Sequence, residues 1–102
     1  MRVIADICVI PINGNISLRK EVAKAHQILK NTGLPVNLHG YGTNIEGEID
    51  EILGAIKEIH TVLHRDGVQR ISTSIKLGSR IDKETSINSK ILSVQQEIKE
   101  RS

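Results

Sequence analysis

Two carboxylates stand in segments whose other residues are typical of β-strands. Asp6 lies within the apolar run RVIADICVIP, and Glu46 lies within TNIEG. Ser72 and Ser74 alternate with apolar residues in a third such segment, VQRISTSIKL. A carboxylate accepts hydrogen bonds and pairs with cations, whereas a serine hydroxyl both donates and accepts. Together these groups would suit a small polar ligand that carries N–H donors or a positive charge.

The same groups do not form a recognisable catalytic pattern. No serine or cysteine has a base and an orienting group at the spacing of a known nucleophile motif. His60 and His64 are four residues apart, which is a metal-ligand spacing on a helix, but the sequence places no third ligand with them. We therefore expect no catalytic residue, no metal site and no cofactor.

The glycines of HGYGTNIEG lack the pattern of a phosphate-binding loop, because there is no G-x-x-x-x-G-K motif and no helix opens at the second glycine. They are more typical of a bend, a bulge or a close approach of backbone. The basic segment 76–83, KLGSRIDK, could hold an anion, with Arg80 as the leading candidate, or could be a solvated loop. A metal or anion sensor built on His60, His64 and this segment is a separate hypothesis.

Hydrophobic periodicity divides the chain into the elements that must position these residues. Strand-like segments are expected at 2–11, 36–41, 43–47 and 68–77. Apolar residues recur at helical spacing in 18–29, 49–63 and 87–98. Gly33 and Asp66-Gly67 stand where the first two helices should end, and Thr85 or Ser86 could cap the third.

The order of these elements predicts an α+β fold in a single domain spanning residues 1–102. The right-handed crossover rule, applied to two split βαβ units, gives a ferredoxin-like βαββαβ sandwich with an extra C-terminal helix. We expect an antiparallel sheet in the order 4-1-3-2, with the first two helices covering one of its faces.

The opposite, open face of this sheet should carry the polar residues, because side chains alternate along a strand. The residues expected there are Ile4, Asp6, Cys8, Ile10, Asn37, His39, Tyr41, Asn44, Glu46, Arg70, Ser72, Ser74 and Lys76. This face could simply be solvated, as one side of an antiparallel sheet often is. Alternatively another subunit partly covers it and its polar residues line a pocket, which the apolar residues on the same face favour.

The composition excludes several classes of function. A chain of 102 residues with 38% hydrophobic and 25% charged residues is an ordinary globular mixture. One Tyr, no Phe, no Trp and a net charge of +2 leave neither the stacking aromatics nor the basic stripe of a nucleic-acid binder. We find no apolar run of membrane-spanning length and no signal-peptide pattern. The single cysteine cannot form an internal disulfide, so we expect a cytoplasmic protein.

Several segments resemble the thiamine-binding protein family, whose members are related to thiamine- and hydroxymethylpyrimidine-binding proteins. These segments are 6–11 (DICVIP), 38–47 (LHGYGTNIEG), 72–76 (STSIK) and 78–83 (GSRIDK). The resemblance covers nearly the whole chain, and the G-T-x-I-E-G part is the most specific. It implies a ferredoxin-like subunit, assembly into dimers or tetramers, and binding of thiamine or its pyrimidine precursor rather than turnover.

The expected ligand-binding residues come from strand alternation and from the family resemblance. The resemblance points first to Thr43 and Glu46, which lie inside the motif, whereas Asp6 and His39 rest on strand alternation alone. The full set is Asp6, His39, Thr43, Asn44, Glu46, Ser72, Ser74 and Lys76. The alternative to a ligand-binding homo-oligomer is a structural or regulatory assembly protein without a small-molecule ligand, whose open face is only a subunit interface.

Overall fold

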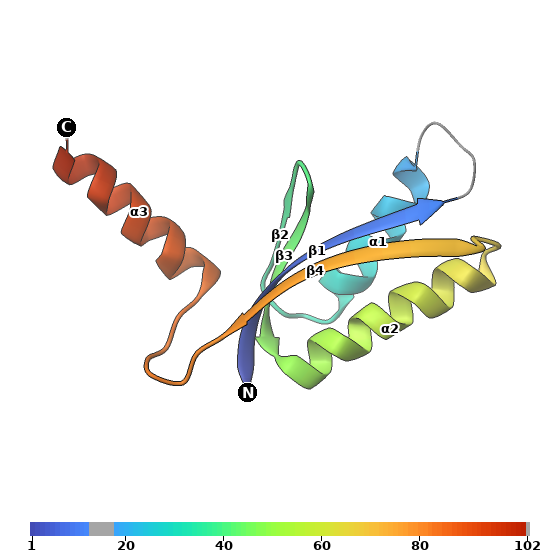
Figure 1. Ribbon diagram of the computed structural model, residues 1–102, viewed down its shortest axis with the longest axis horizontal. Coiled ribbons are helices and arrows are strands. Elements are labelled where there is room, and N and C mark those ends of the chain that lie inside the picture. The colour runs from blue at the N-terminus through green and yellow to red at the C-terminus, as the bar shows by residue number, and fades with distance from the viewer. Residues whose placement is uncertain (13–17, 102) are drawn as a thin grey trace.

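The computed structural model describes residues 1–12 and 18–101, and its strands and helices follow one another as the periodicity predicts (Figure 1). The elements are β1 (Arg2–Ile12), α1 (Arg19–Asn31), β2 (Val36–His39), β3 (Gly42–Glu48), α2 (Ile49–Arg65), β4 (Arg70–Ser79) and α3 (Ile87–Arg101). The α+β class is therefore confirmed.

The strands form one antiparallel sheet in the order β2-β3-β1-β4, which is the predicted order read from the other edge. α1 and α2 lie on the same side of this sheet (Figure 1). The hydrophobic core fills the space between these helices and the sheet, because alternate strand residues and one stripe of each helix are apolar. Its buried members are Val3, Ala5, Ile7, Ala25, Ile28, Leu29, Ile45, Ile52, Ala55, Ile59, Leu63 and Val68.

The ends of α2 follow helix electrostatics. Asp50 and Glu51 lie in its first turn, and His64 and Arg65 lie in its last turn. Acidic groups near the N-terminus and basic groups near the C-terminus both interact favourably with the helix dipole. Gly67 follows with φ of +99°, a conformation that glycine adopts without steric penalty, and it leads the chain out of the helix toward β4.

The second strand is shorter than predicted and stops at His39. Gly40 and Tyr41 form the turn, and β3 begins at Gly42. Tyr41 belongs to this turn and not to a strand, so the expectation that it is a strand residue of the open sheet face is wrong. Gly42 passes so close to β1 that a Cβ atom there would lie 2.5 Å from the Ile7 carbonyl oxygen. Glycine at this position therefore lets the hairpin pack against β1.

α3 contacts the body only where it begins. Ile87 in its first turn is 6% exposed, whereas Ile91, Val94 and Ile98, which continue the predicted apolar stripe, are 48% to 61% exposed. Figure 1 shows α3 extending away from the sheet and from the other two helices. Within the described part of the chain, no helix is both long and apolar enough to cross a membrane.

Candidate functional site

The strand register collects most of the predicted ligand residues on the sheet face opposite α1 and α2. Asp6 on β1 lies between Asn44 on β3 and Lys76 on β4, and residues directly opposite each other point to the same face. The same register pairs Ile4 with Glu46, Cys8 with Ser74 and Ile10 with Ser72. Because Val3, Ala5 and Ile7 face the helices, these even-numbered residues of β1 and their partners face away from them.

Thr43 lies on the other face of the sheet. It is opposite Ile7, is 5% exposed, and its Oγ1 lies 3.1 Å from His26 Nδ1 on α1. It thus lines a small pocket of about 270 Å³ between α1 and the β2–β3 turn, together with His26, His39 and Tyr41. Nearness to Glu46 in the motif suggested a shared surface, but residues at odd separation along a strand point to opposite faces.

Asp6 and His39 are joined across the open face. His39 Nε2 lies 2.5 Å from Asp6 Oδ1, although β3 stands between their strands. His39 is opposite Gly42, which has no side chain to block the ring. The Tyr41 backbone N–H donates to His39 Nδ1 at 3.3 Å, which leaves the proton of a neutral ring on Nε2, facing Asp6. Both side chains are therefore held in a defined orientation.

Glu46 is a buried carboxylate. Its side chain is 7% exposed, and one oxygen, Oε2, has no hydrogen-bond partner. The nearest cation is Arg2, whose Nη2 lies 3.5 Å from Oε2, an ion-pair distance without hydrogen-bond geometry. α3 contacts β3, and Ile4 lies directly opposite Glu46 on β1. Glu46 therefore keeps an unused acceptor in a place where water does not reach it.

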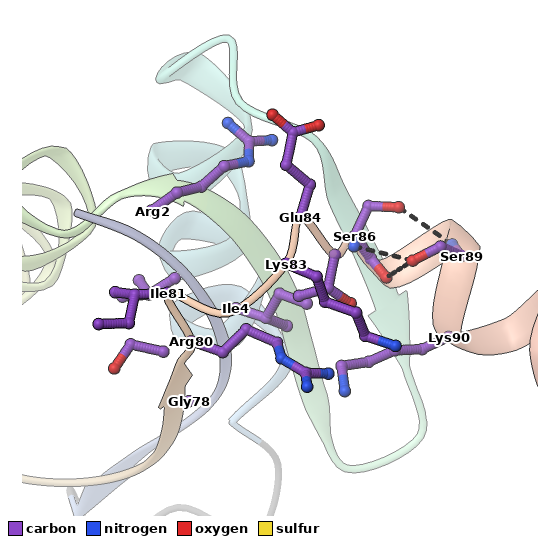
Figure 2. Close-up of a pocket in the computed structure, with 13 residues that line it drawn as sticks. Arg2, Ile4, Gly78, Arg80, Ile81, Lys83, Glu84, Ser86, Ser89 and Lys90 are labelled. Carbon is purple, nitrogen blue, oxygen red and sulfur yellow. Dashed lines mark hydrogen bonds between the residues drawn. The ribbon is translucent and has the colours of Figure 1, made fainter.

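A pocket of about 960 Å³ opens beside Ile4, the cross-strand neighbour of Glu46. Figure 2 shows that its walls come from the start of β1, the end of β4, the segment that follows β4 and the first turn of α3. Its charged lining residues are Arg2, Arg80, Lys83, Glu84 and Lys90. The pocket thus shares Arg2 with the buried carboxylate and adds three further cations in its own lining.

One cation of this pocket is already paired. Arg80 donates from Nε and Nη2 to the two carboxylate oxygens of Asp82, at 2.6 and 2.5 Å. These hydrogen bonds lower the pKa of Asp82 to about 2, and they raise the pKa of the Arg80 guanidinium. In contrast, neither Lys83 nor Lys90 forms an ion pair with a carboxylate among the described residues, although the charge of Lys83 also lowers the pKa of Asp82.

His60 and His64 have structural partners. His60 Nε2 lies 2.7 Å from Thr73 Oγ1 on β4, and His64 Nδ1 donates to the Val68 carbonyl oxygen at 2.7 Å. These bonds tie the C-terminal half of α2 to the segment that follows it. Among residues 1–12 and 18–101, no group of three or more His, Cys, Asp or Glu side chains is arranged to hold a metal ion.

Sequence reasoning missed Arg2 and Lys90 as neighbours of the site. Arg2 is the first residue of the predicted strand 2–11 and is typical of a strand-end cation, and Lys90 is typical of a helix surface. Only the return of the chain after β4 brings the ends of β1 and α3 together. Arg80, in contrast, stood out as the leading cation of its basic segment.

Comparisons with known proteins agree with this architecture. The family model described as Thiamine-binding protein matches residues 5–95. UPF0045 protein sll0230 of Synechocystis is 39% identical over 95 residues, which make up 93% of this chain and 78% of that protein. The crystal structure of MJ1052 from Methanocaldococcus jannaschii has a TM-score of 0.85 at 36% identity, covering 93% of this chain and 97% of that one.

A Thermotoga maritima protein, provisionally assigned to thiamine biosynthesis or salvage, has a similar crystal structure. Its TM-score is 0.80 at 21% identity, over 92% of this chain and 99% of that chain. At this identity the likeness shows the fold alone.

Proposed function

The chain belongs to the thiamine-binding protein family, and from that premise we propose that it binds thiamine, or a related aminopyrimidine such as hydroxymethylpyrimidine, on the open face of its sheet. Thiamine joins a cationic thiazolium ring to an aminopyrimidine with N–H donors. Such a ligand needs hydrogen-bond acceptors and negative charge, both of which this face supplies.

The Oε2 atom of Glu46, which has an ion-pair contact with Arg2 but no hydrogen bond, carries the proposal. Leaving a buried polar group without a hydrogen bond is unfavourable by about 1–3 kcal/mol, and by more for a charged group. Structures retain such groups where a ligand or a functional requirement supplies the missing partner. An N–H donor or cationic ring that displaces the half-exposed Arg2 side chain from Glu46 would satisfy its carboxylate.

The neighbouring polar groups support the same kind of ligand. Asp6, held by His39, adds a second carboxylate one diagonal step from Glu46, a separation of about 7–8 Å between strand positions. Asn44 lies directly opposite Asp6, and Ser74 lies on the far side of β1. Amide and hydroxyl groups at these positions would complete the hydrogen bonds of an aminopyrimidine.

We further propose a non-enzymatic, cytoplasmic homo-oligomer, a dimer or a tetramer, built from ferredoxin-like subunits that each carry α3 as an addition. Exposed apolar side chains on β4 and α3 support association, since Ile75, Leu77 and Val94 are 37% to 61% exposed. Burial of such residues against a second subunit would add stability to a small domain. In this proposal neither a nucleic acid nor a membrane is a partner.

Titration calorimetry with thiamine and with hydroxymethylpyrimidine tests the ligand. For the ligand that binds, Glu46→Gln should weaken binding by about 1–3 kcal/mol, or about 5- to 150-fold, because it removes the charge and half of the acceptors. Glu58→Gln, an exposed position on α2, is the matched control and should bind as the wild type does. Equal affinity in the Glu46 variant and the wild type would contradict the assignment of Glu46.

The second candidate is a structural or regulatory assembly protein with no small ligand. The apolar stripe of α3 favours it, because three turns of that helix leave their apolar residues uncovered. The two candidates differ in the effect of ligand on thermal unfolding. No shift in the midpoint with either compound, together with an oligomer in native mass spectra, would favour the assembly protein.

A further inference from the structure

The pocket between β1, β4 and α3 has more cationic than anionic side chains in its lining. Its described lining contains the cations Arg2, Arg80, Lys83 and Lys90 against the one carboxylate of Glu84. Arg80 is paired with Asp82, whereas neither Lys83 nor Lys90 forms an ion pair with any carboxylate in the part of the chain that the structure describes, although Lys83 also acts electrostatically on Asp82. Two unpaired ammonium groups in one concave site repel each other and raise the local concentration of anions.

The geometry brings these cations to a common side. In Figure 2 the side chains of Arg80, Lys83 and Lys90 end on the same side of the pocket, while Arg2 and Glu84 lie on the other. The hydroxyl-bearing residues Ser79, Thr85 and Ser86 also line it. Cations and hydroxyl groups converging on one hollow are the donors that a phosphate group requires.

The first turn of α3 does not make this site by itself. Ser86 Oγ accepts from the Ser89 N–H at 3.0 Å, so one of the free amides of the helix already has a partner. The attraction for an anion comes from the side chains, chiefly Lys83 and Lys90, and from the volume of about 960 Å³ that they border.

The pocket also adjoins the candidate thiamine site, because two of its lining residues are neighbours of Glu46. Arg2 lines it and at the same time lies 3.5 Å from Glu46, and Ile4 lines it while pairing with Glu46 across the strands. A ligand with a cationic ring at one end and a phosphate at the other would place opposite charges against Glu46 and against the lysines. We infer that the pocket binds the phosphate group of a phosphorylated thiamine-type ligand. This inference rests on the proposed function, which supplies the thiamine part of the ligand.

The experiment compares thiamine, thiamine monophosphate and inorganic phosphate by calorimetry in phosphate-free buffer at low ionic strength. The wild type should bind thiamine monophosphate about tenfold more tightly than thiamine, because two charge-assisted contacts are added. Lys83→Gln combined with Lys90→Gln should remove that advantage and leave thiamine binding unchanged. Lys20→Gln combined with Lys57→Gln, at exposed helix positions, changes the net charge equally and should retain the advantage. All four lysines are exposed, and circular dichroism checks that each variant folds.

The outcomes separate this inference from the proposed function. If thiamine binds but its monophosphate binds no more tightly, the inference fails while the proposed function stands. If inorganic phosphate binds through the two lysines but thiamine monophosphate binds no more tightly than thiamine, the inference also fails, and the pocket is assigned to free phosphate. If binding of thiamine monophosphate depends on the lysines but thiamine alone does not bind, the phosphate site stands and the thiamine-binding proposal fails.

Discussion

Arg2 and Glu46 form an ion pair in which one side chain is exposed and the other is buried. Removing the charge of Arg2 and removing the charge of Glu46 should therefore have different effects on stability. The Arg2 side chain is 56% exposed, whereas that of Glu46 is 7% exposed. Arg2→Gln leaves a buried carboxylate without its nearest cation. Glu46→Gln removes the buried charge and leaves a guanidinium that water already reaches. We predict that the first substitution lowers the free energy of unfolding of the unliganded protein and that the second does not.

The magnitude follows from the distance and the exposure. Two unit charges 3.5 Å apart attract by about 5 kcal/mol at an effective dielectric constant near 20. Desolvation of Glu46 offsets much of this, and the half-exposed Arg2 is screened by water. We therefore expect Arg2→Gln to cost about 1–2 kcal/mol, and Glu46→Gln to be neutral or to stabilise by up to about 2 kcal/mol.

Urea unfolding measures both quantities. The wild type and the two variants are compared at one protein concentration, because any association would shift apparent stability by mass action. Glu58→Gln serves as the exposed control and should change stability by less than about 0.5 kcal/mol. A loss on Glu46→Gln that exceeds the loss on Arg2→Gln would refute the reasoning, since it would mean that the carboxylate is well satisfied before any ligand binds.

Three further predictions concern packing and pH. Gly42→Ala should lower the free energy of unfolding, measured with urea, by about 1–3 kcal/mol, because its Cβ would lie 2.5 Å from a backbone oxygen. Gly47→Ala should lower it by less, because the added Cβ meets the side chain of Leu34 and not backbone. A larger loss for Gly47→Ala would contradict this account of the packing. Ile87→Ala should lower the free energy of unfolding by about 2 kcal/mol, because Ile87 is the buried residue at the start of α3. It should lower the protection of amides against hydrogen exchange in α3 but not in α2. Equal loss of protection in both helices would contradict the view that Ile87 holds α3 alone. Asp82, with its pKa lowered to about 2 by Arg80, should keep the ion pair above pH about 4 and lose its stabilising contribution as the pH falls through about 2. A carboxyl titration by NMR with a midpoint near the ordinary 3.8 would exclude that ion pair.

Which side of the sheet a residue faces was predictable for most of the candidate site. Alternation along β1 separates Asp6 and Cys8 from the core residues Ala5 and Ile7, and the antiparallel register then places Glu46 on the same face as Asp6. The prediction succeeded because alternation is a local property of an extended chain. It was wrong for Tyr41, because the turn came two residues earlier than the alternating pattern suggested.

The contacts that give the site its chemistry could not be read from local pattern. His39 reaches Asp6 across β3, where its own cross-strand neighbour is Gly42, and α3 returns after β4 to contact β3, the strand that carries Glu46. Both effects join residues more than 30 positions apart. The contact of Thr43 could not be predicted from local pattern either, because its partner is a histidine on α1.

By itself the sequence determined the order of strands and helices, the antiparallel sheet and the face on which the carboxylates lie, because periodicity and turn residues act between near neighbours. Only the tertiary structure decided that one carboxylate is buried with an oxygen that has no hydrogen bond, that the other is held by a histidine, and that two lysines without an ion pair among the described residues border the adjacent pocket. Burial and charge pairing depend on which distant segments meet, and that is settled by packing of the whole chain.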